Sequence, residues 1–199
     1  MLRIALLSLV LALSFQAEVQ AQLSVGSAIP MADHAMTDLR GSTVTLQGTM
    51  GQRGLAVIFW SPACPWVQRS DSRVVELANR YRGSGINFIL LNPNDPRLAA
   101  SEGIVQMRQQ ADNANYISPY LVDSGAQVAR AFGATRTPEI FLFNAQGNLV
   151  YRGAIDDSPS DVALVENNYF QDALDAVVAG GQPATTTSRA FGCSIRLGQ

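Results

Sequence analysis

Two apolar runs of strand length dominate the hydrophobic pattern. Residues 86–91 are apolar except for Asn87, whereas residues 55–60 form a continuous apolar run. A strand that is covered on both faces has this pattern, because neither of its faces meets water. We therefore expect a strand at 55–60 in the centre of a sheet and a second apolar strand at 86–91.

The segment between these runs has a helical period instead. Apolar residues recur at three- and four-residue spacing with charged residues between them, which is typical of an amphipathic helix. Pro65 suits the first position of this helix, and Gly83 and Gly85 suit its end. The apolar positions of the predicted helix are Val67, Val74, Leu77, Ala78 and Tyr81.

The rest of the chain continues this alternation of strands and helices. We expect further strands at 43–46, 120–122, 139–143 and 148–152 and further helices at 102–111, 124–132 and 162–177. The two strands at 139–152 form a hairpin around residues 144–147. Together these elements predict an α/β sandwich with parallel central strands and an antiparallel hairpin.

The first 21 residues have the features of an export signal. Arg3 is followed by a short apolar run at residues 4–13, and Val19 and Ala21 are small residues at the −3 and −1 positions of a cleavage site. An uncleaved anchor is the alternative, although the run is shorter than the roughly 20 residues that a membrane helix needs. We expect a signal peptide at 1–21, a domain at 22–181, a tail at 182–199, and a periplasmic or secreted protein.

Composition narrows the chemistry further. The chain has 199 residues, of which 47% are hydrophobic, and this suits one globular domain. A formal charge of −2 gives no electrostatic indication of nucleic-acid binding. All 14 basic residues are arginines, which excludes lysine Schiff bases and the P-loop lysine.

The candidate reactive group is the thiol of Cys64, one of only two cysteines. It follows the predicted strand 55–60 and precedes Pro65 at the start of the helix. Backbone N–H groups and the helix dipole at that position favour the thiolate, which attacks disulfides and peroxides. We expect an exposed, partly ionised sulfur; the alternative is a buried, inert cysteine.

Four segments of the chain resemble the redoxin branch of the thioredoxin superfamily, the group named for alkyl hydroperoxide reductase and thiol-specific antioxidant. They are DLRGSTV at 38–44, VIFWSPACP at 57–65, AFGATRTP at 131–138 and FLFNAQG at 141–147. The resemblance spans about residues 26–180. It implies a thioredoxin-like three-layer α/β/α sandwich with a central mixed sheet, Cys64 as the nucleophile, and no metal or other cofactor.

The same resemblance assigns residues around the sulfur. Thr137 and Pro138 match the pair whose backbone faces the nucleophile and pairs with an incoming chain, with Pro138 after a cis peptide bond. Pro65 and Trp66, beside Cys64, are also expected to face the substrate. For Trp66, covering the edge of the core is an equally good interpretation.

The sequence departs from the family in ways that bear on the reaction. Thioredoxin-type reductases carry a second cysteine where Val67 stands, and copper-delivering relatives carry it where Gln68 stands. A peroxiredoxin has proline where Val57 stands and an arginine at or beside Pro138. The loop is therefore a single-thiol site with neither signature complete.

Cys193 is the candidate partner of Cys64. The ending Phe-Gly-Cys-Ser-Ile at 191–195 resembles a C-terminal element of a subset of exported redoxins that have a similar single-cysteine loop. This resemblance implies that the tail folds back and supplies Cys193 as a resolving thiol. A purely structural disulfide and a free tail cysteine remain alternatives.

Other polar residues are weaker candidates. The lone His34 suits a surface turn, and Asp156, Asp157 and Asp161 suit turn and N-cap positions better than a metal site. Arg69 and Arg73 on the predicted helix either raise the local positive potential or form a solvated face.

The sequence therefore predicts an exported thiol–disulfide oxidoreductase that acts through Cys64, and the resemblance implies that Cys193 resolves the intermediate. Its expected partners are protein or small-molecule thiols, disulfides or peroxides, without nucleic acid and without a membrane once the signal is removed. The alternatives are a peroxiredoxin-like thiol peroxidase and a non-catalytic thioredoxin-fold binding module with a structural disulfide.

Overall fold

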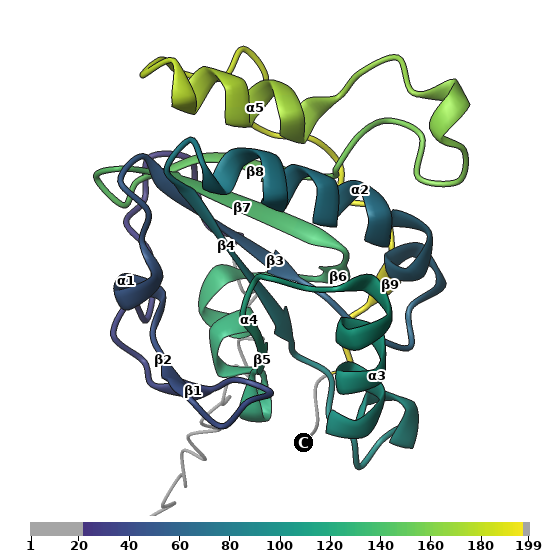
Figure 1. The fold of residues 1–199 in the computed structure, drawn as a ribbon. Coiled ribbons are helices and arrows are strands. Elements are labelled where there is room, and N and C mark those ends of the chain that lie inside the picture. Colours follow the sequence, from purple (N-terminus) through teal and green to yellow (C-terminus); the bar gives the residue numbers. More distant parts are fainter. Residues whose placement is uncertain (1–21, 197–199) are drawn as a thin grey trace, which may run out of the picture.

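The computed structural model describes residues 22–196, so the predicted signal at 1–21 lies outside the described residues. A five-stranded sheet in the order β5-β4-β3-β7-β8 forms the middle of the molecule (Figure 1). β3, β4 and β5 are parallel, and β7 is antiparallel to both β3 and β8. The strands are β3 (Gly54–Phe59), β4 (Ile86–Asn92), β5 (Tyr120–Val122), β7 (Glu139–Asn144) and β8 (Leu149–Gly153).

Helices cover both faces of this sheet. One apolar cluster joins alternate residues of β3 to α2 (Pro65–Arg82), α3 (Ile104–Ala114) and α5 (Tyr169–Val178). A second cluster joins the other residues of β3 to α1 (Leu46–Thr49) and α4 (Gln127–Phe132). Since both faces of β3 are covered, every residue of this strand is buried, and the predicted three-layer sandwich with a mixed central sheet is confirmed.

Short elements complete the fold. β1 (Met36–Thr37) pairs with β2 (Thr43–Val44), and β6 (Arg136–Thr137) pairs with β9 (Cys193–Ser194) near the C-terminus. The 3-10 helices are η1 (Ala100–Glu102), η2 (Ser124–Ala126) and η3 (Val162–Leu164). Within residues 22–196, no helix has the length and apolar character that crossing a membrane requires.

The predicted helix at 162–177 is wrong in its first half. Only η3 forms there, residues 165–168 are irregular, and α5 begins at Tyr169. Polar side chains take over the backbone donors of this stretch: Asp161 accepts a hydrogen bond from Ala163 N, and Asp157 accepts one from Glu166 N. Such local side-chain bonds compete with helix formation.

The predicted strand at 43–46 is also shorter than expected. β2 ends at Val44, and the Thr45 hydroxyl accepts a hydrogen bond from Gly48 N at 2.9 Å. Thr45 is therefore the N-cap of α1, which begins at Leu46. The threonine side chain satisfies a backbone N–H group that lacks a partner in the first turn of the helix.

Phe132 provides a test of the core that supports the site. Its fully buried ring packs edge-to-face on Phe59, Phe141 and Phe143. We expect Phe132→Ala to lower the free energy of unfolding by about 3–5 kcal/mol, because it removes apolar burial and leaves a cavity. Denaturant unfolding with a fitted slope measures this change.

Val105→Ala, on the solvent side of α3, is the matched control, because the Val105 side chain is 65% exposed. We expect this control to stay within about 0.5 kcal/mol of the native protein. Equal losses for the two variants would contradict the assignment of Phe132 to the core.

Candidate functional site

Cys64 lies at the N-terminus of α2, where the loop after β3 turns into the helix. It is the N-cap residue, and Pro65 occupies the start of the helix, as the sequence predicts. The Cys64 carbonyl accepts a hydrogen bond from Gln68 N at 3.1 Å, and the Gln68 amide donates to the Pro62 carbonyl at 2.9 Å. The first turn of α2 therefore holds the loop in place.

A buried carboxylate, which the sequence analysis did not identify, fixes the other side of this loop. The Ser61 hydroxyl donates to both oxygens of Glu102, at 3.0 and 2.9 Å, and the Asn94 amide donates at 2.9 Å. Glu102 is 5% exposed, so it needs these donors to compensate for lost hydration. No local pattern identifies such a residue, because its partners come from different segments.

A second network ties the end of β3 to α2 and α3. The Trp60 indole N–H donates to the Tyr116 hydroxyl at 2.9 Å, and that hydroxyl donates to the Asp71 carboxylate. The Gln110 amide also donates to Asp71, at 3.1 Å. Burial raises the pKa of Asp71, and these hydrogen bonds oppose that effect.

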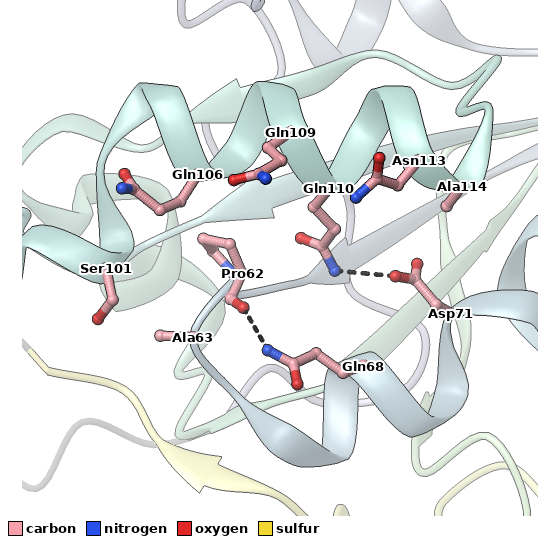
Figure 2. Close-up of a pocket in the computed structure, with 10 residues that line it drawn as sticks. All are labelled: Pro62, Ala63, Gln68, Asp71, Ser101, Gln106, Gln109, Gln110, Asn113 and Ala114. Atoms are coloured by element: carbon pink, nitrogen blue, oxygen red, sulfur yellow. Dashed lines mark hydrogen bonds between the residues drawn. The ribbon is translucent and has the colours of Figure 1, made fainter.

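Asp71 lies on the wall of a polar groove of about 680 Å³ that adjoins the Cys64 loop through Pro62 and Ala63 (Figure 2). Figure 2 shows the hydrogen bonds from Gln68 to Pro62 and from Gln110 to Asp71 among the residues that line this groove. The remaining lining is mostly amide side chains from α3, namely Gln106, Gln109 and Asn113.

The expected exposure of the Cys64 sulfur is wrong, because the residue is only 2% exposed. It forms a disulfide with Cys193, with the two Cα atoms 6.0 Å apart, and the C-terminal tail covers it. Of the three alternatives for Cys193, a free tail cysteine is excluded. Cys64 belongs to the apolar cluster on one face of the sheet, and it is also the N-cap residue of α2. Its burial therefore leaves it at the start of the helix, as predicted.

The tail binds to the strand edge that the family resemblance assigns to an incoming chain. Thr137 pairs with Cys193 and Arg136 with Ser194 in antiparallel register, and Ile195 N donates to the Thr135 carbonyl at 3.1 Å. The Cys64 Sγ lies 3.0 Å from the Thr137 carbonyl oxygen. The peptide bond between Thr137 and Pro138 is cis.

Gly192 gives this pairing a steric requirement that the sequence analysis missed. A Cβ atom at this position would lie 2.2 Å from the Thr137 carbonyl oxygen, closer than any side chain tolerates. Only glycine therefore allows the tail to lie this close to the site.

Farther along the tail, Arg196 N donates a hydrogen bond to the Asn94 side chain at 2.7 Å, which connects the tail to the Glu102 network.

Trp66 contacts the tail. The Trp66 and Phe191 rings pack edge-to-face, with their centroids 4.7 Å apart. The Arg69 guanidinium carbon lies over the Trp66 ring, 5.1 Å from its centroid. Pro65 is exposed beside it. The structure thus brings Pro65, Trp66 and Thr137 around the disulfide, while a role in contacting substrate stays a prediction.

Arg73 does not belong to a solvated helix face. Its side chain is 14% exposed and forms an ion pair with the buried carboxylate of Asp156. Burial raises the pKa of Asp156, and the Arg73 charge opposes this shift.

Asp157 and Asp161 bind backbone N–H groups in the turn and at the cap of η3. Residues 22–196 contain no acidic, His or Cys cluster arranged to hold a metal ion.

Known proteins that resemble this chain include both named enzymes and solved structures. A Halalkalibacterium halodurans protein named thiol-disulfide oxidoreductase ResA is 26% identical over 148 residues, which is 74% of this chain and 80% of that protein. A conserved Geobacillus kaustophilus protein of known structure is 30% identical, with a TM-score of 0.81 over 87% of this chain and 92% of that one. A Sinorhizobium meliloti structure is 30% identical, with a TM-score of 0.82 over 89% and 97% of the two chains.

More distant structures share the fold alone. One is a DsbE-type thiol:disulfide interchange protein of Chlorobium tepidum, which is 17% identical and has a TM-score of 0.55 over 66% of this chain and 85% of that one.

The sequence model of the Redoxin family matches residues 24–169, which include β3, the Cys64 loop and the strand edge at Thr137. The chain is therefore a member of the Redoxin family of the thioredoxin superfamily.

Proposed function

We propose that this protein is a thiol–disulfide oxidoreductase in which Cys64 and Cys193 form the redox couple. The observation that carries the proposal is the disulfide at the N-terminus of α2, seated against the Thr137 carbonyl. The ResA proteins that resemble the chain are named for the same activity. A helix N-terminus stabilises a thiolate, so it makes Cys64 a good leaving group and a good nucleophile at neutral pH.

Reduction begins at the more accessible sulfur. Cys193 is half-buried, whereas Cys64 is buried, so an incoming thiolate reaches the Cys193 sulfur. A bond forms between that thiolate and Cys193, the Cys64–Cys193 bond breaks, and Cys64 leaves as a thiolate. A second thiolate then displaces Cys193, which yields the oxidised donor disulfide and the reduced Cys64 and Cys193 pair.

The reduced protein passes these two electrons to a substrate disulfide. The Cys64 thiolate attacks one substrate sulfur, and the other substrate sulfur leaves as a thiolate. Cys193 then attacks Cys64 in the mixed disulfide, releases the second substrate thiol, and restores the original bond. The tail makes this last step intramolecular, which gives it a high effective concentration.

The proposed setting is an oxidising compartment. Cleavage before Gln22 delivers residues 22–181 as the domain and 182–199 as its tail, in a periplasmic or secreted protein where disulfides persist. The proposed partners are thiols and disulfides of proteins or small molecules outside the cytoplasm.

The reduction potential separates catalysis from a permanent structural bond. We expect a value within about −270 to −120 mV, the range of known exchange enzymes. Equilibration in graded thiol–disulfide buffers, followed by acid quenching, alkylation and mass spectrometry, measures it. A potential below about −300 mV would instead support the non-catalytic binding module. Rapid, Cys64-dependent consumption of hydrogen peroxide would support the peroxidase.

The sulfur that receives the first attack is a second test. We expect oxidised protein treated briefly with limiting 2-mercaptoethanol, then acid-quenched, to carry the mixed disulfide on Cys193, because Cys64 is shielded. Peptide mass spectrometry locates the adduct. The single-cysteine variants Cys64→Ser and Cys193→Ser provide standards for each adduct, and an adduct mainly on Cys64 would refute the proposed direction of attack.

Gly192→Ala tests the seating of the tail. The added methyl group collides with the Thr137 carbonyl oxygen, so we expect the disulfide to become easier to reduce by about tenfold, or about 30 mV in potential. Gly181→Ala is the control, since a Cβ atom there meets only the Ala176 carbonyl oxygen, at an ordinary 3.6 Å. Identical potentials for both variants and the native protein would show that the close approach of Gly192 does not support the disulfide.

A further inference from the structure

A second cavity lies beside the disulfide, between the tail and the sheet. It has a volume of about 350 Å³, within the size range of small-molecule sites. Residues 188–192 of the tail form one wall, and residues around β6, β7 and β8 form the other. Three arginines line it, Arg136, Arg152 and Arg189, together with a single carboxylate, Glu139.

The carboxylate does not neutralise this cluster of arginines. One Glu139 oxygen accepts hydrogen bonds from the backbone N–H groups of Thr135 and Arg136, at 2.8 and 3.0 Å, and the other accepts one from the Gln22 amide at 3.2 Å. Burial raises the pKa of Glu139, and its backbone hydrogen bonds and the charge of Arg152 oppose that effect. The lining therefore has an excess of positive charge.

Two of the arginines have donors to spare. The Arg152 Nε is buried and has no hydrogen-bond partner within residues 22–196. In the same described part of the chain, the Arg189 side chain forms neither a hydrogen bond nor an ion pair. Buried donors without partners are rare in folded proteins, and guanidinium groups bind carboxylates with paired hydrogen bonds.

We propose that this cavity binds the carboxylates of a small acidic thiol, the electron donor that reduces the disulfide at Cys193. The inference rests on the proposed function and adds the donor's chemical class. Gly192 lines the cavity, and Cys193 is the next residue, with its Cα about 3.8 Å away. A donor whose carboxylates bind in this cavity is therefore held against the tail segment that carries Cys193.

The overall charge of the protein does not explain such a preference. The chain has a formal charge of −2, which disfavours an anionic thiol at long range. Any selection for acidic thiols must therefore come from local positive charge.

The donor thiolate forms a disulfide with Cys193 and expels the Cys64 thiolate. A second donor thiolate then displaces Cys193 and forms the donor's own disulfide, which completes the reduction.

The test compares three thiols with the oxidised protein: mercaptosuccinate, 2-mercaptoethanol and cysteamine, which are acidic, neutral and basic. Each rate constant is divided by that of the same thiol with neutral dipyridyl disulfide, which removes differences in intrinsic reactivity. We expect the normalised rate for mercaptosuccinate to exceed that for 2-mercaptoethanol about tenfold at low salt and cysteamine to be slowest.

Variants locate the source of the preference. We expect Arg152→Gln and Arg189→Gln each to lower the normalised mercaptosuccinate rate about threefold and to leave the 2-mercaptoethanol rate unchanged. Arg80→Gln is the control, because Arg80 is exposed near the opposite end of α2 from Cys64 and forms an ion pair with Glu76. Arg189 is exposed, so its variant removes charge without disturbing the core.

Two outcomes overturn the inference in distinguishable ways. Equal normalised rates for the three thiols, in the native protein and in all variants, would remove the acidic donor and leave thiol–disulfide exchange in place. A disulfide that none of the three thiols reduces would refute the proposed function itself, and the cavity proposal with it.

Discussion

The antiparallel pairing of the C-terminal tail with the strand edge at Arg136 and Thr137 is the constraint on which the rest of the site depends. It places Cys193 over the start of α2, buries Cys64 and forms one wall of the arginine-lined cavity. Each backbone hydrogen bond contributes only about 1 kcal/mol net, so the pairing alone is weak. The disulfide and the close approach of Gly192 to Thr137 give the tail a defined position.

Most of the fold could be predicted because its elements leave local signals. The run at 55–60 is continuous because β3 lies between two helix layers, and α2 ends near Gly83 as its periodicity indicates. The prediction failed at 162–168, where Val162 and Val165 have a helical spacing although Val162 is exposed. There the side chains of Asp157 and Asp161 bind the backbone donors that a helix would use.

The site was only partly predictable, because some of its features depend on adjacent residues and others on segments far apart in the sequence. Cys64 is marked by the strand before it and Pro65 after it, so its place at the helix start follows from adjacent residues. Its pairing with Cys193 bridges a sequence separation of 129, and nothing local to either cysteine determines it. The burial of Cys64 and the role of Glu102 depend equally on segments distant in sequence, which a single sequence does not connect.

Placing the second sulfur on a tail couples the redox state to the strand edge. In a loop with two adjacent cysteines, reduction changes a few atoms and leaves the backbone in place. Here the bond closes a loop of 129 residues and restrains the tail by roughly 5 kcal/mol in the chain-entropy account. Once it breaks, non-covalent contacts alone hold the tail, namely the pairing with Thr137, the packing of Phe191 on Trp66 and the bond from Arg196 N to Asn94. The proposed reduction therefore loosens the tail on this strand edge in the same step that frees the Cys64 thiol.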